Sequence, residues 1–371
     1  MPALPRHMDP GDVPYHLLRP LFRQEEPYPE RWRSILVLRP CCIGDVLQST
    51  ALVTVLRRAF PQARLGYAVG PWSRPVLENN PRLDEIVDTG SIVGGRKPSP
   101  GAFLSLVRRL RQGRWDACFV LERSALFSLA AWMAGIPDRI GLDNRGRGLA
   151  LTKRVPLRPR RQEAEAVLDL ARAIGLDVTG ATTEFYPSDT DRLEVSRLLT
   201  GNGMPWVVLA PGGGVNPGTE LIAKRWPAEN FGELAARLAR HGYLPLIIGG
   251  PQDHQAAEAT LEASQGTALN LCARLTLSGC GALLQQAKLL VANDTGVMHL
   301  AAAVDTPVVG LFGPTDPAMY APYGVRHRAL WHPRTCSPCF RQKERPPQCM
   351  MECIRSITVD EAEAAALQLL A

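Results

Sequence analysis

Polar residues gather at two points of the stretch 293–317, which reads NDTGVMHLAAAVDTPVVGLFGPTDP. An apolar run precedes the first point, a helix of small residues follows it, and a second apolar run leads to the second point. This order predicts strand, polar turn, helix, strand, so both points lie at the carboxyl ends of neighbouring parallel strands. Ligands bind at that edge of such sheets, and a helix N-terminus offers N–H groups to anions. The polar residues concerned are Asp294, Thr295, Gly296, His299, Thr315 and Asp316. The stretch therefore predicts a nucleotide pocket, although Asp294 and His299 also fit a helix cap and a helix face.

A single carboxylate follows the first strongly apolar run, 34–39, in the turn Ile43-Gly44-Asp45. A helical pattern begins here, so Asp45 stands at a helix N-terminus, and Gly44 can take a tight turn. A carboxylate in this position can take a proton from an attacking hydroxyl, which an inverting group transfer needs. It can equally cap the helix and interact with the helix dipole. The spacing alone leaves both interpretations open.

A glycine turn follows the apolar run 206–210 and is followed in turn by the basic sequence AKRWP. Backbone N–H groups of Gly212 and Gly213 can approach phosphates closely, and Lys224 can neutralise them. The alternative is a flexible loop with surface cations. Asp253, which comes after the next apolar run, is a candidate for bonding a ribose hydroxyl.

These motifs together resemble glycosyltransferase family 9, the lipopolysaccharide heptosyltransferases, over residues 34–358. The matching segments are IGDV, the KRWP that follows the glycine turn, and DTGVMHLAAAV with VVGLFGPTDP. The resemblance implies that Asp45 is the general base, that Lys224 stands at the donor diphosphate, and that 294–296 and His299 meet the donor. It implies an ADP-sugar donor and an anionic, lipid-linked glycan acceptor. The sequence departs from the family before Asp45, where Pro40-Cys41-Cys42 replaces the more usual small polar residues.

The acceptor side is expected in the first half of the chain. The resemblance places an Arg-Ser pair there, which is Arg123-Ser124 in this sequence, and Gly44 lies beside the base. A guanidinium matches phosphate and carboxylate groups bidentately, so Arg123 is the candidate for binding an anionic acceptor.

Two series of alternating strands and helices position these residues, and they are divided near residues 180–200. Each series is long enough for a doubly wound sheet of its own. We expect an N-terminal extension at 1–33 that packs loosely, an acceptor-binding domain at 34–185, a nucleotide-sugar-binding domain at 186–357 and a C-terminal helix at 358–371. The resemblance implies the GT-B architecture, an α/β fold with two Rossmann-like domains facing across a cleft.

Charge is spread unevenly along the 371 residues. Residues 1–180 hold 27 basic and 18 acidic side chains, a net charge of +9, whereas residues 181–371 hold 15 and 18, a net charge of −3. Seven basic residues and no acidic one lie between 145 and 161. This run is compatible with an anionic membrane leaflet and equally with a solvated surface. No signal-peptide pattern and no apolar run of about 18 residues is present, so we expect a cytoplasmic protein without a nucleic-acid partner. A peripheral position at the cytoplasmic face of the inner membrane stays open as one option.

Nine cysteines without an export signal are expected to be reduced rather than paired. Four of them cluster, and their spacing is compatible with a structural zinc ion, which we do not expect because the second pair is looser than usual. These four are Cys336, Cys339, Cys349 and Cys353. The Asp189-Thr190-Asp191 segment is expected to cap a helix rather than to hold a metal ion. We expect no required metal or cofactor.

The leading hypothesis is an inverting transferase that moves a heptose or a related sugar from an ADP-sugar to a lipopolysaccharide-core or similar acceptor. One alternative is a GT-B-like sugar-nucleotide epimerase, which would need further acid and base residues. The other is a non-catalytic protein that binds sugar nucleotides or polysaccharides, against which the presence of Asp45, Lys224 and Asp294 argues.

Overall fold

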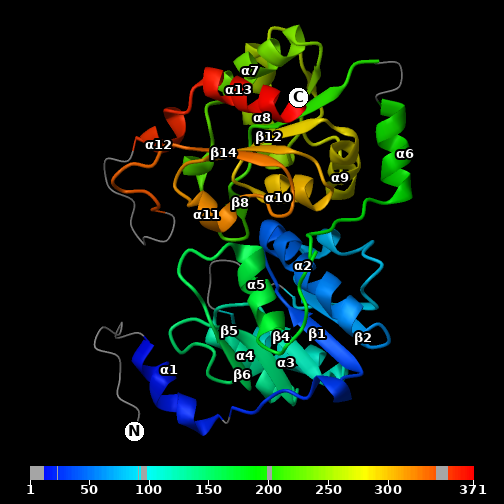
Figure 1. Cartoon of the computed structure of the whole chain (residues 1–371), viewed down its shortest axis with the longest axis vertical. Helices are drawn as coiled ribbons and strands as arrows, with labels where there is room; N and C mark the ends of the chain where they lie inside the picture. The colour runs from blue at the N-terminus through cyan, green and yellow to red at the C-terminus, as the bar shows by residue number, and fades with distance from the viewer. Residues whose placement is uncertain (1–11, 23, 91, 93–97, 199–202, 340–349) are drawn as a thin grey trace. The chain divides into compact units, whose positions relative to one another are not determined.

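A computed structural model describes residues 12–22, 24–90, 92, 98–198, 203–339 and 350–371. The chain divides into two compact units, Met1–Ala181 and Thr182–Ala371. Each unit is built on one six-stranded sheet whose strand pairs are all parallel (Figure 1). No helix among the described residues combines the length and the apolar character that crossing a membrane requires.

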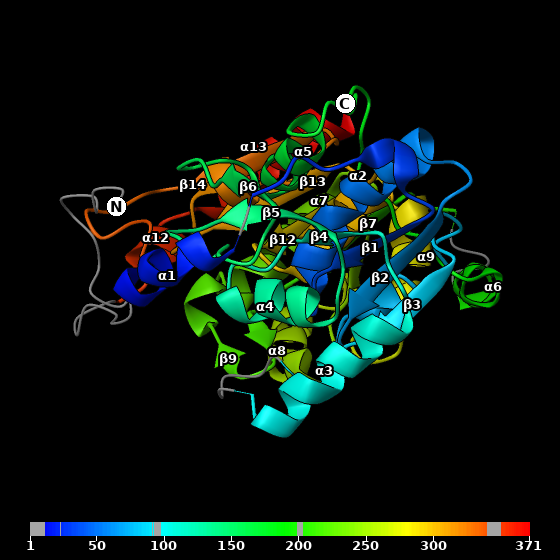
Figure 2. The same ribbon diagram turned by 90° about the horizontal axis from the view of Figure 1, so that it is seen from below.

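The first sheet has the strand order β3-β2-β1-β4-β5-β6. Its strands are β1 (Ser34–Leu38), β2 (Arg64–Val69), β3 (Glu85–Asp88), β4 (Ala117–Val120), β5 (Asp138–Asp143) and β6 (Lys153–Pro156). Helices α3 (Pro100–Gln112) and α4 (Ala125–Met133) share one core with alternate residues of β1 and β4 and lie side by side (Figure 2). Helices α2 (Ile43–Ala59) and α5 (Glu163–Arg172) pack against each other. Because every residue of β1 is buried, helices must cover both faces of this sheet.

The second sheet has the order β11-β10-β7-β12-β13-β14. Its strands are β7 (Trp206–Ala210), β10 (Leu244–Ile247), β11 (Leu269–Asn270), β12 (Leu289–Asn293), β13 (Val308–Phe312) and β14 (His327–Trp331). Helices α7 (Ala228–Arg240), α8 (His254–Ala263) and α13 (Val359–Leu370) share one core with Leu289 and Val291. Leu290 points to the opposite face and is also fully buried, since α10 (Gly296–Ala303) and α9 (Leu277–Gln286) lie there.

Both sheets reverse their strand order once, between β1 and β4 in the first and between β7 and β12 in the second. The loops that leave the carboxyl ends of the two central strands turn to opposite faces at such a reversal, and ligands bind in the space between them. Asp45 follows β1, Gly212 follows β7 and Asp294 follows β12. The topology therefore brings these residues to the switch points of their own sheets.

Smaller elements complete the units: α1 (Val13–Leu18), α6 (Asp189–Leu198), α11 (Pro317–Tyr320), α12 (Glu352–Arg355) and the antiparallel pair β8 (Val215–Asn216) and β9 (Thr219–Glu220). The sequence did not predict β6, β11 or β14. Each of the three is an edge strand of its sheet. The exposed residues in β11 and β14 interrupt the apolar pattern by which a strand is predicted.

The described part of the N-terminal extension is bound to the first unit rather than loosely packed. Trp32 is buried, and its Nε1 donates to Oδ2 of Asp138 at 2.7 Å. Asp12 is buried as well, and its Oδ1 accepts from Nη2 of Arg147 at 2.9 Å. Our expectation of loose packing is wrong for these residues, because their polar partners lie more than 100 positions away in the sequence and no local pattern reveals them.

Helix α13 belongs to the core of the second unit. Leu369 is 5% exposed and packs in the same cluster as Leu234 and Leu238 of α7. Thr358 caps the helix, since its side chain accepts from the N–H of Glu361 and the Glu361 carboxylate accepts from the N–H of Thr358. Helix α13 thus helps to cover one face of the second sheet.

We predict that Leu369→Ala lowers the free energy of unfolding of the second unit by about 2–5 kcal/mol, because it leaves a cavity under α13. The matched change Leu193→Ala, at a side chain that is 59% exposed, is expected to stay within about 0.5 kcal/mol of the parent. Urea unfolding followed by tryptophan fluorescence measures both. Equal effects of the two substitutions would mean that α13 is not part of the core.

Candidate functional site

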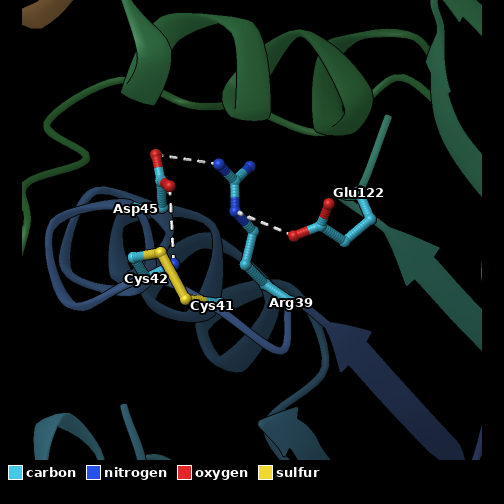
Figure 3. The surroundings of a disulfide bond; sticks show 5 residues. All are labelled: Arg39, Cys41, Cys42, Asp45 and Glu122. Atoms are coloured by element: carbon cyan, nitrogen blue, oxygen red, sulfur yellow. Dashed lines mark hydrogen bonds and ion pairs between the residues drawn. A yellow bond between two sulfur atoms is a disulfide. The ribbon is translucent and has the colours of Figure 1, made fainter. Parts of the chain in front are cut away.

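Asp45 lies in the first turn of α2, directly after the end of β1. Its Oδ2 accepts from the backbone N–H of Cys42 at 3.4 Å, so it does cap the helix. Its Oδ1 lies 2.9 Å from Nη2 of Arg39 (Figure 3). The side chain is still 33% exposed, so the carboxylate can meet a ligand as well as the helix. The two interpretations of Asp45, cap and proton acceptor, are therefore compatible.

Arg39 is a buried cation at the carboxyl end of β1, and sequence reasoning missed it. Its Nη1 donates to the carbonyl oxygen of Leu121 at 3.3 Å, and its Nε lies 3.9 Å from Oε1 of Glu122. Burial alone would raise the pKa of the Asp45 carboxyl, but the charge and hydrogen bond of Arg39, with help from Arg123, hold it below its usual value. Asp45 is thus ionised even in moderately acidic solution.

Glu122 responds in the opposite direction. Its burial raises the pKa of its carboxyl, the negative charge of Asp45 adds to that effect, and the attraction of Arg39 and Arg123 does not cancel it. Two carboxyls on either side of one guanidinium therefore differ in proton affinity, which is the pattern of an acid–base site.

The predicted acceptor residues are close to this cluster but are already engaged. Arg123 forms an ion pair with the buried carboxylate of Glu163 on α5. Ser124 caps α4, since its hydroxyl accepts from the N–H of Leu126 at 3.4 Å. Gly44 lies inside the first turn of α2 and not among the glycines with positive φ, so our expectation of a glycine-dependent turn there is wrong.

The turn before Asp45 contains a disulfide between the adjacent Cys41 and Cys42, joined by a cis peptide bond (Figure 3). The expectation of reduced cysteines is therefore wrong for this pair. Adjacency in sequence does not reveal pairing, because two neighbouring cysteines bond only when the peptide between them takes an unusual conformation.

In the second unit, Lys224 and Asp294 meet although 70 positions separate them. Nζ of Lys224 lies 2.8 Å from Oδ2 of Asp294 and donates to its carbonyl oxygen at 3.2 Å. Their side chains are 13% and 4% exposed. The cap of α10 is Thr295, so the alternative interpretation of Asp294 as the helix cap is wrong. Gly296 begins the helix, and His299 is buried within it.

The carboxylate of Asp253 accepts a hydrogen bond from the backbone of the glycine turn. Oδ1 of Asp253 accepts from the N–H of Gly213 at 2.7 Å, and Oδ2 accepts from the N–H of Gly250 at 2.9 Å. A Cβ on Gly212 would lie 2.2 Å from the Asp253 carboxyl carbon, and Gly213 has a φ of +92°. Only glycine fits this approach, so the glycines keep the turn in contact with its carboxylate.

Asn293 is a second residue that sequence reasoning did not assign. It is fully buried, its Oδ1 accepts from the N–H of Trp226 at 2.9 Å, and its Nδ2 donates to the carbonyl oxygens of Pro211 and Gly212 at 2.9 and 3.1 Å. One side chain therefore ties the glycine turn and the KRWP segment to β12. A buried amide at the end of an apolar strand is the signal that could have pointed to it.

Two further predicted groups have different outcomes. Of the cysteine cluster, Cys349 lies outside the described residues, Cys353 is buried in α12, and Cys336 and Cys339 are partly exposed. Across the residues that the structure describes, no group of three or more histidine, cysteine or carboxylate side chains is arranged to hold a metal ion. At the start of α6, the N–H of Asp191 donates to the hydroxyl of Ser188 at 3.1 Å, a contact of the predicted capping kind, and Oδ1 of Asp191 accepts from the hydroxyl of Thr276 at 2.9 Å.

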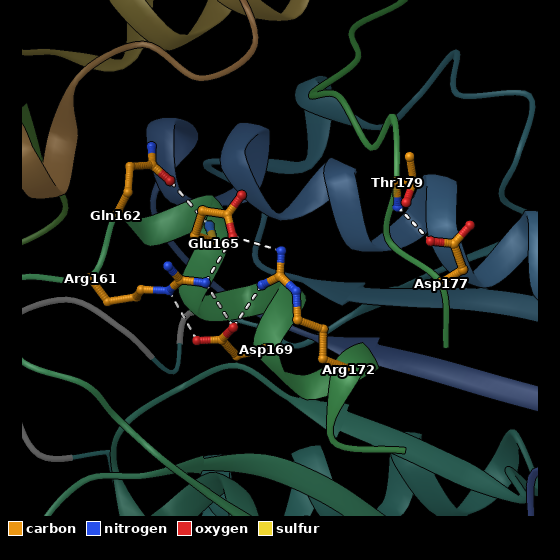
Figure 4. A network of polar contacts seen from close by, with 7 residues as sticks. All are labelled: Arg161, Gln162, Glu165, Asp169, Arg172, Asp177 and Thr179. Atoms are coloured by element: carbon orange, nitrogen blue, oxygen red, sulfur yellow. Dashed lines mark hydrogen bonds and ion pairs between the residues drawn. The ribbon is translucent and has the colours of Figure 1, made fainter. Parts of the chain in front are cut away.

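Part of the basic run 145–161 forms ion pairs within the first unit. Arg161 bonds both Glu165 and Asp169 at 2.9 Å, and Arg172 completes this network (Figure 4). Lys153 pairs with Glu26 at 2.6 Å. The run is therefore not simply a solvated basic surface.

Comparison with known proteins gives a consistent assignment. The profile of glycosyltransferase family 9 (heptosyltransferase) matches residues 103–350. Lipopolysaccharide heptosyltransferase 2 of Escherichia coli (strain K12) is 32% identical over 312 residues, 80% of this chain and 87% of that protein. Lipopolysaccharide heptosyltransferase 2 of Salmonella typhimurium is 30% identical over the same shares.

Solved structures agree with the sequence comparison. The family 9 glycosyl transferase from Veillonella parvula DSM 2008 superimposes with a TM-score of 0.77 at 24% identity, covering 94% of this chain and 99% of that one. The ADP-heptose lipopolysaccharide heptosyltransferase II of E. coli does so with a TM-score of 0.72 at 25% identity, covering 91% and 98%. The GT-B fold class predicted from the sequence is confirmed. Because the family profile spans more than half of the chain and a relative is 32% identical over most of it, the chain belongs to glycosyltransferase family 9 and is a glycosyltransferase.

Proposed function

We propose that the protein transfers a heptose, or a closely related sugar, from an ADP-sugar to the core of a lipopolysaccharide, with inversion at the anomeric carbon. The observation that carries this proposal is the partly exposed carboxylate of Asp45 at the switch point of the first sheet. The names of the relatives support the sugar and the acceptor, and the structural neighbour from E. coli is an ADP-heptose heptosyltransferase, which supports the donor.

In this mechanism Asp45 accepts the proton of the acceptor hydroxyl as its oxygen attacks the anomeric carbon. The bond between that carbon and the diphosphate oxygen breaks, and the electron pair leaves with ADP. Arg123 and Ser124, with Gly44 beside the base, are proposed to contact the acceptor. Binding of an anionic acceptor by Arg123 then requires an exchange of its Glu163 partner for a phosphate or carboxylate of the acceptor.

The donor is proposed to bind at the switch point of the second sheet. Lys224 and the N-terminus of α10 at Thr295 and Gly296 would stabilise the developing charge on the diphosphate, with His299 close by in the same helix. Gly212 and Gly213 would bring their backbone near the phosphates. Both carboxylate oxygens of Asp253 accept from backbone N–H groups, one of Gly213 and one of Gly250. We therefore propose that Asp253 positions the glycine turn for the donor, with or without a hydrogen bond to the ribose. Asp294 holds the Lys224 ammonium in place.

The acceptor would be lipid-linked, and we propose that the first unit binds the anionic leaflet that carries it. Leu17, Leu18 and Leu21 in α1 and the turn after it are 57%, 47% and 75% exposed. This segment lies against the basic loop after β5, where Arg147 pairs with Asp12 and stacks over the ring of Tyr15 at 5.8 Å. Exposed leucines beside basic residues are typical of proteins that bind anionic membrane surfaces.

Replacement of the base tests the reaction. Asp45→Asn is expected to lower kcat by about 10²–10⁴-fold, because the amide cannot accept the proton, while calorimetry should find unchanged affinity for the ADP-sugar. Asp45→Ala should behave in the same way. Asp177→Asn, at an exposed carboxylate of the same unit, is the matched control. Full activity of the Asp45 variants would sink the mechanism, and conversion of the donor without acceptor would favour an epimerase.

The phosphate role of Lys224 can be separated from its structural pairing. Loss of a charged hydrogen bond of about 1.5–3 kcal/mol should raise the Kd for ADP by roughly 10–100-fold. Because Lys224→Met alone leaves the buried Asp294 carboxylate unpaired, the double variant with Asp294→Asn is the informative one. Lys288→Met, at an exposed lysine of the same unit, serves as the control. Unchanged ADP affinity in the double variant would remove Lys224 from the donor site.

Membrane binding is testable with vesicles. Since burial of a leucine side chain is worth about 1.5–3 kcal/mol, the change Leu17→Ser with Leu21→Ser should reduce binding to phosphatidylglycerol vesicles by at least tenfold. The matched pair Leu193→Ser with Leu198→Ser on α6 changes exposed leucines of the second unit and should have no effect. Equal binding of the two double variants would contradict the assignment, as would equal binding of the parent to phosphatidylcholine vesicles.

A further inference from the structure

Arg39 lies between the carboxyl groups of Asp45 and Glu122 and contacts the first more closely than the second. The guanidinium contacts Asp45 at 2.9 Å through Nη2, whereas its Nε lies 3.9 Å from Glu122, beyond hydrogen-bond distance (Figure 3). That Nε is buried and has no hydrogen-bond partner among the described residues. Figure 3 shows the Glu122 carboxylate on the Nε side of the guanidinium, opposite to Asp45. The geometry is that of one cation with a primary and a secondary carboxylate partner.

The three side chains come from different elements that meet at one edge. Arg39 follows β1, Asp45 begins α2, and Glu122 follows β4, the strand that pairs with β1 in register from Ile35 and Ala117 onward. Arg39 is 7% exposed, and Glu122 has a side chain that is 23% exposed. Arg39 stays charged, and since little water reaches it, these carboxylates offset the cost of burying its guanidinium, so its position is linked to their protonation.

An ion pair between a general base and a buried cation has two opposing effects on proton transfer. The pair orients its carboxylate, but it also weakens the attraction of that carboxylate for a proton. When Asp45 takes the proton of the acceptor hydroxyl, its side chain becomes neutral, and Arg39 loses its primary partner. A buried guanidinium without a carboxylate is costly, so a second carboxylate within reach eases the transfer.

We infer that Arg39 is a positioning residue for the base Asp45 and that Glu122 is its alternate partner, which takes over the guanidinium while Asp45 holds the proton. The inference rests on the proposed role of Asp45. The acceptor O–H bond breaks and its proton moves to Asp45, the new bond to the anomeric carbon forms, and the diphosphate leaves with the electron pair. As Arg39 turns to Glu122, a proton held by that carboxyl passes to water. After the product leaves, Asp45 releases the acceptor's proton to water, Arg39 returns to Asp45, and Glu122 takes a proton back from water, so that one proton is released in each turnover.

Other charges face this cluster and enter the expected pH dependence. Arg123, on the loop after β4, adds positive charge near Asp45 and Glu122 and pairs with Glu163 of α5. Tyr67 of β2 is buried beside Arg39, with its hydroxyl bonded to Ser49 of α2. Arg39 is the largest favourable influence on the ionised form of Asp45, ahead of Arg123 and the Cys42 N–H. Removal of Arg39 should therefore dominate any change in the acid limb of the pH profile.

The sign of that change follows from the two opposing causes at Asp45. Burial raises its pKa, and Arg39 lowers it to below the usual value. The parent enzyme should lose kcat/KM only as the pH falls through this depressed pKa. With Arg39 removed and burial retained, the acid limb should move upward by about one pH unit or more. With Glu122 made neutral, Arg39 stays with Asp45, so the limb should move downward and kcat should fall.

The experiment measures kcat and kcat/KM from acid to neutral pH at saturating donor for Arg39→Met, Arg39→Lys and Glu122→Gln. Arg39→Met should show the upward shift and at least a tenfold lower kcat. Arg39→Lys keeps the charge and should leave the limb nearly in place. The control is Arg58→Met, an arginine of α2 with a half-exposed side chain, which should match the parent. A limb that does not move in Arg39→Met, or an equal shift in Arg58→Met, overturns the inference.

Glu122→Gln keeps the test informative if Arg39→Met does not fold, because the substitution preserves shape. An unshifted limb with parental kcat in Glu122→Gln removes Glu122 as the alternate partner. Affinity for ADP, measured by calorimetry, should be unchanged in all of these variants because the proposed donor site lies in the second unit, and thermal unfolding followed by circular dichroism reports on folding of the first unit. If the acid limb does not shift as expected but Asp45→Asn is inactive, only this inference is overturned. An active Asp45→Asn enzyme overturns the proposed function itself.

Discussion

The site depends on a constraint of parallel sheets, which cannot accept unpaired polar groups between their strands. The central strands β1, β7 and β12 are buried almost throughout, so polar chemistry can appear only where they end. Each sheet reverses its strand order once, and the two loops that part there leave backbone and side chains accessible. Asp45 and Asp294 follow the central strands β1 and β12 at these two reversals, and Lys224 pairs with Asp294 there.

The candidate residues satisfy one another's charges and hydrogen bonds. Lys224 pairs with Asp294, and Asp253 accepts from two backbone N–H groups. Such pairing offsets part of the desolvation cost of burying these charges. It also means that, in the proposed mechanism, an anionic ligand exchanges one partner of a paired cation for itself. Affinity is then a difference between two sets of contacts, and substitutions that break a pair report on stability as well as on binding.

The sequence predicts long periodic elements and strand-end motifs well, because strands that are buried on both faces of a sheet consist of continuous apolar runs. It predicted Asp45 and Asp294 as polar residues at strand ends and Lys224 in the basic segment after the glycine turn, and the solved structures confirmed the fold class around them. It did not predict β14, whose residues are largely exposed, or the Cys41–Cys42 bond. It also missed Arg39 and Asn293, because a polar residue that ends an apolar strand is assigned to the strand, and its partners become visible only in three dimensions.

The two units show how one topology can serve two kinds of chemistry. Both central strands are followed by a proline, at Pro40 and at Pro211, and then by a turn. In the first unit the turn is a cysteine pair, and a buried arginine faces a partly exposed carboxylate. In the second it is a glycine run, and a carboxylate faces a lysine instead. A cation that tunes a carboxylate suits proton transfer, whereas close backbone approach with a fixed lysine suits phosphate. The division of labour that we propose therefore rests on a few residues near equivalent strand ends and not on the topology, which both units share.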